Sequence, residues 1–228
     1  VKISYWTSIN FFMNSEINKP TLSVMYSTDT FITPFRKHLS DNFKVSWCPI
    51  PYTPPPKSVF EFLTFPFRLL SKKLKTFNYS RGSEILFVEF ADETLALVSK
   101  IRKNKMIVTR LHRYELFKLP KADWSVIDIV IVVNNWMKEE LELKVPSLKG
   151  KIICIHNFVD VNFWNKPTRR KINNKLSIVG NIEKRKGHDK AIVAFSKLLK
   201  KRDNLQLSII GKSKDQSFSD SLNVLVSD

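Results

Sequence analysis

The residues best able to do chemistry lie in one stretch, Lys175 to Lys214. Three of the five glycines in the chain fall within it, namely Gly180, Gly187 and Gly211, and three consecutive cations at 184–186 precede the second. Glycine lets a backbone turn with positive φ or approach a ligand closely. Because the second glycine opens a predicted helix, whose free N–H groups attract anions, this basic turn is suited to a phosphate or diphosphate.

The same turn has a plainer interpretation. Lys184, Arg185 and Lys186 would then form a solvated basic surface, and Gly180 and Gly187 would serve only the backbone. The spacing alone does not choose between a phosphate site and such a surface.

Other reactive side chains give weaker indications. His112 follows a predicted strand, where a lone loop histidine usually has no catalytic role. The remaining histidines are interpreted as surface or structural residues, and neither they nor Asp160 have metal-ligand spacing, so no metal site is expected. Cys48 and Cys154 lie far apart, which indicates neither a disulfide framework nor a zinc site and favours a reducing, cytoplasmic compartment.

These residues must be positioned by a repeating pattern of strands and helices. Leu22–Tyr26 is preferred as the first strand of the main sheet, with Lys2–Ser8 as the alternative. Further strands are predicted at Phe43–Ile50, Glu84–Phe90, Met106–Leu111, Asp128–Val133 and Lys151–His156. Helices are predicted from Thr33 (N-cap) to Asp41, and at Ser58–Phe77, Asp92–Lys103 and Trp136–Leu143. Such apolar strands, alternating with helices, predict a doubly wound α/β domain whose ligands bind at the carboxyl edge.

A second domain is predicted after a polar, basic linker at 165–174. The first domain is thus expected at 1–164 and the second at 175–228. The second starts with a strand at Lys175–Val179, a helix at Asp189–Lys201 and a strand at Leu205–Ile210, and a further strand is predicted at Leu222–Val226. One βαβ unit and a strand leave exposed sheet edges, so this domain is expected to be incomplete.

Composition narrows the possible partners. The chain has 228 residues with 43% hydrophobic residues, which argues against wholesale disorder, and no apolar run reaches the roughly 18 to 20 residues needed to span a bilayer. A net charge of +17 attracts nucleic acid, an anionic membrane or phosphorylated small molecules, although it can also reflect general residue usage. The chain has no nucleic-acid-binding motif and its cations are dispersed, so nucleic acid is not expected as a partner.

The segment Ser58–Phe77 combines aromatic residues with cations. This combination suits an anionic membrane surface, which would make the protein peripheral to a membrane. The favoured interpretation is that its apolar face covers the sheet, while its lysines still allow membrane contact.

Several motifs together resemble the GT-B glycosyltransferases of glycosyltransferase family 4. Val179-Gly180-Asn181, followed after four residues by Lys186-Gly187 and later by Ile209-Ile210-Gly211, is similar to the start of their donor-binding domain. The segment 155–163 resembles their hinge, and 108–115 resembles the loop that places a histidine at the interdomain cleft. The resemblance covers residues 84 to 211 and implies a GT-B-like fold with two Rossmann-like domains.

The resemblance implies a transferase that uses a nucleotide-diphosphate sugar, retains anomeric configuration and requires no metal or other cofactor. Lys186 matches the lysine that stabilises the leaving diphosphate, and Gly180 and Gly187 match the glycines that approach it. Asn181 replaces the usual arginine, a loss for which Lys184 or Arg185 could compensate. In this context His112 matches the histidine that contacts the donor sugar.

The overall expectation is a hexosyltransferase of the family 4 type that acts on a glycan or a lipid-linked acceptor in polysaccharide biosynthesis. The glycine-rich loop after the first strand is absent at 27–30, and the paired glutamates of the donor domain lie beyond the chain, so a weakly active fragment is expected. Two alternatives stay open: a basic nucleic-acid-binding protein and a non-catalytic nucleotide-binding remnant.

Overall fold

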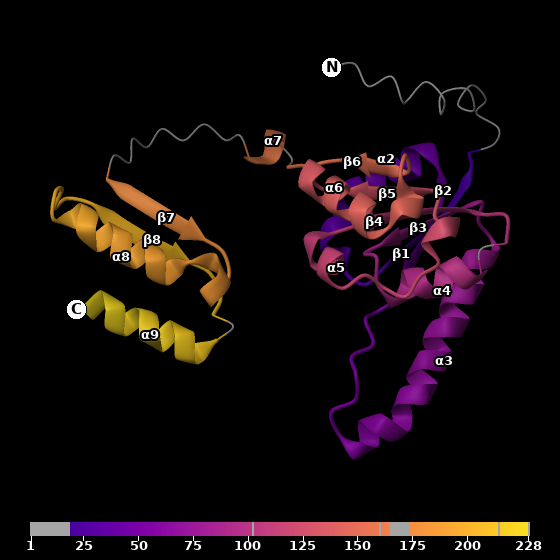
Figure 1. Cartoon of the computed structure of the whole chain (residues 1–228), viewed down its shortest axis with the longest axis horizontal. Helices are drawn as coiled ribbons and strands as arrows, with labels where there is room; N and C mark the ends of the chain where they lie inside the picture. The colour runs from indigo at the N-terminus through magenta and orange to yellow at the C-terminus, as the bar shows by residue number, and fades with distance from the viewer. Residues whose placement is uncertain (1–18, 102, 160, 165–173, 214, 228) are drawn as a thin grey trace. The chain divides into compact units, whose positions relative to one another are not determined.

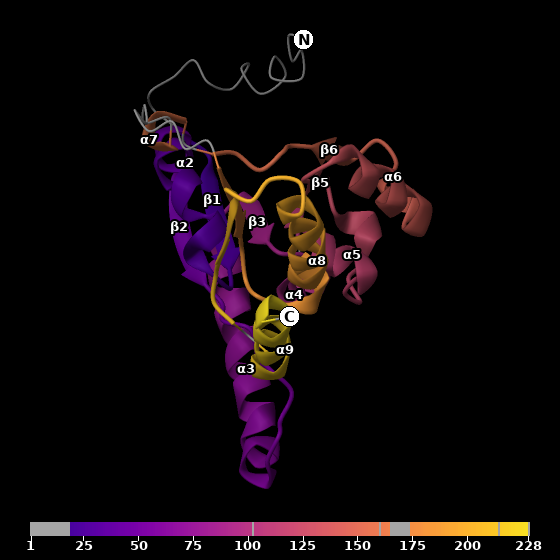
Figure 2. The same ribbon diagram turned by 90° about the vertical axis from the view of Figure 1, so that its left-hand side faces the viewer.

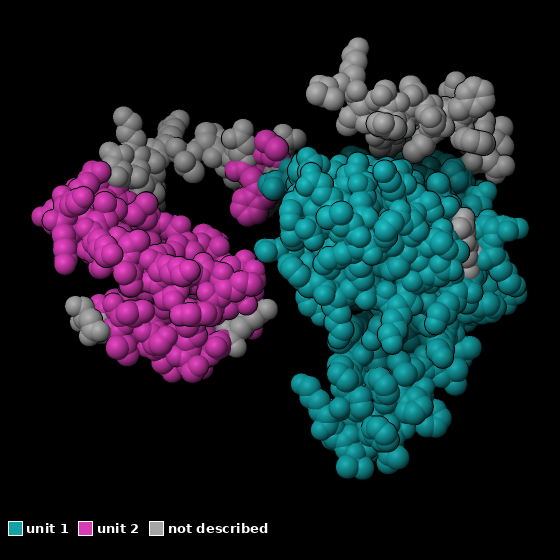
Figure 3. Space-filling view, viewed as in Figure 1, with its two compact units in different colours: residues 1–159 teal, residues 160–228 magenta. Residues whose placement is uncertain are grey.

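The computed structural model describes residues 19–101, 103–159, 161–164, 174–213 and 215–227. The chain forms two compact units, residues 1–159 and 160–228 (Figure 3). The predicted linker at 165–174 lies, except for residue 174, outside the described residues. The proposed domain boundaries therefore stay a prediction, and each unit is described by itself.

The first unit contains a six-stranded sheet in the order β2-β1-β3-β4-β5-β6, and every neighbouring pair is parallel. The strands are β1 Thr21–Tyr26, β2 Lys44–Pro49, β3 Ile85–Glu89, β4 Met106–Leu111, β5 Ile129–Val132 and β6 Ile152–Cys154. All six strands are at the predicted places, which confirms the α/β fold. The alternative first strand, Lys2–Ser8, lies outside the described residues.

Helices cover both faces of this sheet (Figure 1). They are α2 Arg36–Asn42, α3 Val59–Arg81, α4 Glu93–Ile101, α5 Arg113–Phe117 and α6 Asn135–Lys144. One face carries the larger core, where Leu86 and Val130 of the sheet pack with Leu95 of α4 and Met137 of α6. The other face carries a smaller core around Val24, on the side of α2.

The start of α2 differs from the prediction. Thr33 does not act as its N-cap, because a 3-10 turn at Thr33–Phe35 runs directly into the helix. The Thr33 hydroxyl instead donates to the carbonyl oxygen of Asp29 at 3.0 Å. Pro34 lies within the first two positions of this 3-10 turn, where its missing N–H costs no hydrogen bond.

The favoured interpretation of the Ser58–Phe77 segment is wrong. This segment forms most of α3, but its apolar side chains do not cover the sheet: the buried residues of α3 are Lys72, Thr76 and Ser80. These three recur every four residues and so share one face of the helix. The amino-terminal half of α3 extends well beyond the sheet in two perpendicular views (Figures 1 and 2), so its apolar residues have no sheet beneath them.

The second unit contains a parallel strand pair, β7 Lys175–Val179 and β8 Gln206–Ile210, connected through α8 His188–Leu199. This confirms the predicted βαβ arrangement. Its small core joins Ile192 of α8 to Phe218 and Leu222 of the helix α9 Gln216–Ser227. A short helix, α7 Val161–Trp164, also belongs to this unit.

The predicted strand at Leu222–Val226 is wrong, because these residues lie in α9. The carboxylate of Asp215 accepts a hydrogen bond from the backbone N–H of Phe218 at 3.1 Å, which satisfies a free donor at the helix start. Phe218 and Leu222, four residues apart, are both buried on the face toward Ile192. Residues four apart lie on the same face of a helix, so burial of these two side chains favours a helix. The apolar run at 222–226, which alone fits a strand, is therefore part of α9.

Candidate functional site

Polar residues meet at the carboxyl edge of the main sheet, between β3 and β4. Glu89 is the last residue of β3 and pairs in register with Arg110 of β4. His112 follows the last residue of β4. Because the two strands are adjacent and parallel, residues 21 and 23 positions apart in the chain are brought together at one edge, where ligands bind in open α/β sheets.

The carboxylate of Glu89 holds both of the other side chains. Its Oε1 accepts hydrogen bonds from Nε and Nη2 of Arg110 at 2.9 and 2.6 Å. The same oxygen lies 2.8 Å from Nε2 of His112. The side chains of Glu89, Arg110 and His112 are 0%, 8% and 12% exposed, so the ion pair is buried and depends on these hydrogen bonds.

The second carboxylate oxygen of Glu89 is the notable atom of this cluster. Oε2 is buried and has no hydrogen-bond partner within the described part of the chain. A desolvated acceptor without a donor is unfavourable by about 1–3 kcal/mol. Among the described residues, Oε2 is thus an unsatisfied acceptor inside the cluster, shielded from solvent.

Two aromatic rings hold the imidazole of His112. The ring of Phe90 stacks on it with centroids 4.6 Å apart and an interplanar angle of 29°. Phe31 lies at the same centroid distance, tilted by 50°. Phe90 has φ +75°, a conformation unfavourable for a bulky side chain, which places its ring against the histidine.

Arg110 connects this edge of the sheet to the segment after β1. Its Nη2 also donates to the carbonyl oxygen of Phe31 at 3.0 Å, and its guanidinium lies 4.6 Å from the ring centroid of Phe35. The guanidinium therefore fixes the position of the loop that carries one of the rings on His112.

Glu115, three residues after His112, fixes the backbone of His112 through hydrogen bonds. The N–H of His112 donates to Oε2 of Glu115 at 2.6 Å, and the N–H of Glu115 donates to the carbonyl oxygen of His112 at 3.1 Å. Burial raises the pKa of the Glu115 carboxyl, and the hydrogen bond from His112 partly opposes this increase. The imidazole thus has little rotational or backbone freedom.

Sequence reasoning identified only His112 in this cluster. It missed Glu89, Arg110, Phe31 and Phe90. A usable signal was present, since Glu89 and Arg110 are charged residues at the ends of strands that are otherwise apolar. Charges at such positions of two neighbouring parallel strands indicate a paired site.

The predicted diphosphate turn connects β7 to α8. Gly180 follows β7 with φ +154°, and Gly187 is the N-cap of α8 with φ +72°. Gly211 follows β8, and a Cβ added there would lie 1.7 Å from the carbonyl oxygen of Gly180. The three glycines therefore let two strand ends approach each other and let the backbone turn into the helix.

The cations of this turn are not equivalent. Nζ of Lys184 lies 2.5 Å from the carboxylate of Asp189, and Nη2 of Arg185 lies 2.6 Å from that of Glu183. The hydrogen bond from Lys184 lowers the pKa of Asp189. Lys186 is exposed and forms no ion pair with any residue of the described chain. Lys186 is thus the cation of this turn whose charge a ligand can use.

Two other predicted residues of the second unit are placed as follows. Asn181 is exposed next to Gly180 and adds no charge to the turn. His188 is fully buried at the start of α8, and neither ring nitrogen has a hydrogen-bond partner among the described residues. His188 is therefore an interior residue of the second unit and does not face solvent.

The remaining histidines lie outside these two clusters. His38 is exposed on α2, as expected for a surface helix residue. His156 is exposed, with Nδ1 3.0 Å from the carbonyl oxygen of Val133. Within the described ranges, no group of three or more His, Cys, Asp or Glu side chains could hold a metal ion. Nor does any helix there have the length and apolar character needed to cross a membrane.

Comparison with known proteins gives two matches. Residues 162–227 match the family model described as glycosyl transferases group 1, and this range includes the turn at Gly180–Gly187. The chain is also similar to the apo form of the lipopolysaccharide outer core galactosyltransferase WaaB, with a TM-score of 0.55 and 16% identity. The match covers 90% of this chain and 66% of that one. No curated protein matches the sequence.

The likeness to WaaB shows the fold, which confirms the GT-B-like α/β class. The family match is independent of it, because it rests on sequence and falls within the second unit. Both matches are consistent with a glycosyltransferase fold. The chain spans just under two thirds of the structure that it matches.

Proposed function

We propose that this chain is part of a glycosyltransferase that transfers a sugar from a nucleotide-diphosphate donor to a glycan or a lipid-linked acceptor. The observation that carries the proposal is the turn after β7, where Gly180 and Gly187 have positive φ and Lys186 is exposed and forms no ion pair within the described residues. The group 1 match covers this turn, and the fold likeness agrees with it.

The proposed role of Lys186 follows from where charge develops. As the bond between the sugar and the diphosphate breaks, negative charge increases on the departing phosphate oxygens. A fixed cation at that position stabilises the transition state more than the ground state, which lowers the barrier. Lys184 and Arg185 already neutralise carboxylates and Asn181 is neutral, so Lys186 supplies most of the positive charge.

The proposed role of His112 is to contact the donor sugar. Glu89 accepts a hydrogen bond from Nε2–H, while Phe90 and Phe31 restrict the ring. An imidazole held in this way positions a hydroxyl group rather than acting as a mobile base. We further propose that the protein is a family 4 glycosyltransferase, that transfer retains the anomeric configuration and that it requires no metal.

Nucleotide binding tests the proposal directly. Thermal unfolding of the full chain is followed with UDP, GDP and their sugars, and affinity is measured by calorimetry. At least one nucleotide diphosphate should raise the Tm of the wild type. Lys186→Ala should weaken binding by about tenfold or more, because a charge-assisted hydrogen bond contributes about 1.5–3 kcal/mol.

Arg185→Ala is the matched control for this experiment. It removes the same charge from the same turn, but from a side chain already paired with Glu183. Its effect on nucleotide affinity should be clearly smaller than that of Lys186→Ala. Equal small effects of the two variants would show that the diphosphate does not bind at this turn.

The two rival functions give different results. A nucleic-acid-binding protein would bind a short DNA duplex with strong salt dependence and would not respond to the nucleotides. A non-catalytic remnant would bind a nucleotide diphosphate but would not transfer sugar to an acceptor. Sugar transfer that is lost in Lys186→Ala would support the enzyme.

A further inference from the structure

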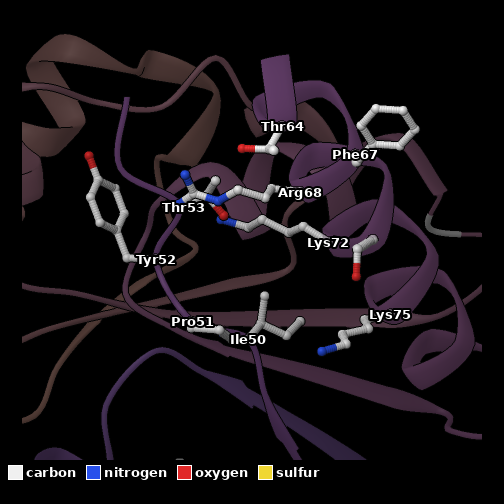
Figure 4. A pocket seen from close by; sticks show the side chains of 10 residues that line it. Ile50, Pro51, Tyr52, Thr53, Thr64, Phe67, Arg68, Lys72 and Lys75 are labelled. Atoms are coloured by element: carbon white, nitrogen blue, oxygen red, sulfur yellow. The ribbon is translucent and has the colours of Figure 1, made fainter. Parts of the chain in front are cut away.

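A basic pocket lies outside both residue clusters described above. It has a volume of about 640 Å³ and lies between the segment Ile50–Thr53, which follows β2, and the helix α3. Figure 4 shows Arg68 and Lys75 extending from α3 toward this segment. The pocket is therefore formed by two parts of the first unit that face each other.

The chemistry of the pocket suits an anion with several oxygen atoms. Arg68, Lys72 and Lys75 line it at a spacing of four and three residues, which places them on one face of α3. Thr53, Thr64 and Ser71 line it as well, although the hydroxyl of Thr64 already donates to backbone carbonyl oxygens of its own helix. The lining residues in the described part of the chain include no Asp or Glu. Cations and hydroxyl donors around one cavity favour a phosphate group.

Of the three cations, one is paired with a carboxylate and the other two are available to a ligand. Lys72 is buried, and its Nζ lies 3.1 Å from the carboxylate of Glu93, which offsets its charge. Arg68 is half-buried and Lys75 is exposed, and neither forms an ion pair within the described residues. The net positive charge of the pocket is therefore that of Arg68 and Lys75.

An exposed apolar surface lies on the same helix. Phe60 and Phe62 are 74% and 70% exposed, and Phe67, which also lines the pocket, is 74% exposed. The exposed large hydrophobic residues on α3 are Val59, Phe60, Phe62, Leu63, Phe67, Leu70, Leu74 and Phe77. An apolar surface of this extent on a projecting helix is typical of a binding surface.

We propose that α3 docks this protein on an anionic membrane, with its exposed apolar residues in the bilayer interface and a lipid phosphate headgroup in the pocket at Arg68 and Lys75. Aromatic side chains are favoured at the interface, and each nearby cation adds attraction to anionic lipid. The proposal depends on α3 and the pocket beside it, and it holds whether or not the chain transfers sugar.

The combination of groups favours a lipid over other polyanions. Nucleic acid or a soluble phosphate would use the cations but would leave Val59, Phe60 and Phe62 in water. A second copy of the chain could cover those residues, but it would bring the cations of two α3 helices close together. An anionic lipid alone has both an apolar part and a phosphate in one molecule.

Vesicle flotation tests the proposal with the full chain. Vesicles of phosphatidylcholine are compared with vesicles that also contain phosphatidylglycerol. The apolar variant is Phe60→Ser with Phe62→Ser, and the pocket variant is Arg68→Gln with Lys75→Gln. All four side chains are half-buried or exposed, so circular dichroism should show an unchanged fold. The control variant, Lys44→Gln with Lys149→Gln, removes two exposed cations from the same unit outside the pocket.

The wild type should float with the phosphatidylglycerol vesicles and only weakly with phosphatidylcholine alone. The pocket variant should reduce the partition coefficient by about 25-fold, at about fivefold per cation. The control should reduce it by about twofold at most, because exposed charges away from the pocket are screened. The apolar variant should reduce binding to both kinds of vesicle.

Four results would overturn the proposal. The first is an equal loss in the pocket and control variants, which would mean diffuse attraction by the net charge. The second is equal binding to the two kinds of vesicle, and the third is binding that the apolar variant leaves unchanged. The fourth is a wild type that does not bind vesicles and forms a dimer instead. If the Phe60→Ser, Phe62→Ser variant were then monomeric, α3 would bind a second copy of the chain.

Discussion

Oε1 of Glu89 lies 2.8 Å from Nε2 of His112 and accepts two hydrogen bonds from Arg110. One buried carboxylate oxygen therefore orients Arg110, which lies on the next strand, and His112, which follows that strand. This arrangement makes Glu89 a positioning residue at the carboxyl edge of the sheet.

Glu89→Gln should destabilise the first unit. It keeps the shape of the side chain but removes the charge, and so leaves the buried guanidinium of Arg110 without its counter-ion. Breaking a buried ion pair in this way costs about 3 kcal/mol of unfolding free energy. Urea unfolding measures this change. Glu139→Gln, an exposed position on α6, is the control and should change stability by no more than about 0.5 kcal/mol.

His112→Gln should affect the sugar part of donor binding rather than the nucleotide part. Under the proposed function, affinity for a nucleotide sugar should fall by about tenfold, while affinity for the free nucleotide diphosphate stays unchanged, because one hydrogen bond to the sugar is lost. Calorimetry with both ligands measures the difference. Lys186→Ala should instead weaken both, and a uniform effect of His112→Gln would contradict its proposed role.

Gly211→Ala should destabilise the second unit. The added Cβ would lie 1.7 Å from the carbonyl oxygen of Gly180, so the two strand ends must separate. We expect a loss of about 2–3 kcal/mol, seen as faster hydrogen exchange of the amides of α8 and β8. Gly82→Ala is the control, because nothing lies within 4 Å of a Cβ there and its φ is −89°. That variant should be neutral or more stable by about 0.5 kcal/mol.

Glu115→Gln should change how stability depends on pH. Burial raises the pKa of Glu115 above its usual 4.5 in the folded chain, so the folded state favours the protonated carboxyl. This contribution is fully present below the pKa of the unfolded chain and is lost as pH rises through the folded pKa. Relative to the wild type, the variant should therefore gain stability as the pH rises from below 4.5. Urea unfolding across this range measures the gain, and parallel pH profiles would contradict the assignment.

Much of the architecture could be predicted because it depends on local patterns. The apolar strand at Met106–Leu111 and the strand at Lys175–Val179 have the predicted bounds. Both are short β-rich runs between polar segments, so their own residues are enough to identify them. The strand predicted at 222–226 was wrong because an apolar run of that length also fits a helix, and contacts of Phe218 and Leu222 with Ile192 decide between them.

Part of the candidate site could likewise be predicted from the sequence, and part could not. From residue order alone it was clear that Gly180, Lys186 and Gly187 share one turn, because neighbours in the chain must be neighbours in space. That Lys184 and Arg185 are each paired with a carboxylate could not be predicted, because it depends on side-chain orientation within the turn.

The sequence by itself therefore determined the alternation of strands and helices, the glycine-flanked basic turn and the aromatic, cationic character of 58–77. Only the tertiary structure decided that Glu89 meets Arg110 and His112, because this contact depends on the register of two parallel strands. It also decided that most of the large apolar side chains of α3 remain exposed. Whether an apolar face is covered depends on what lies opposite it, which the residues of that helix do not specify.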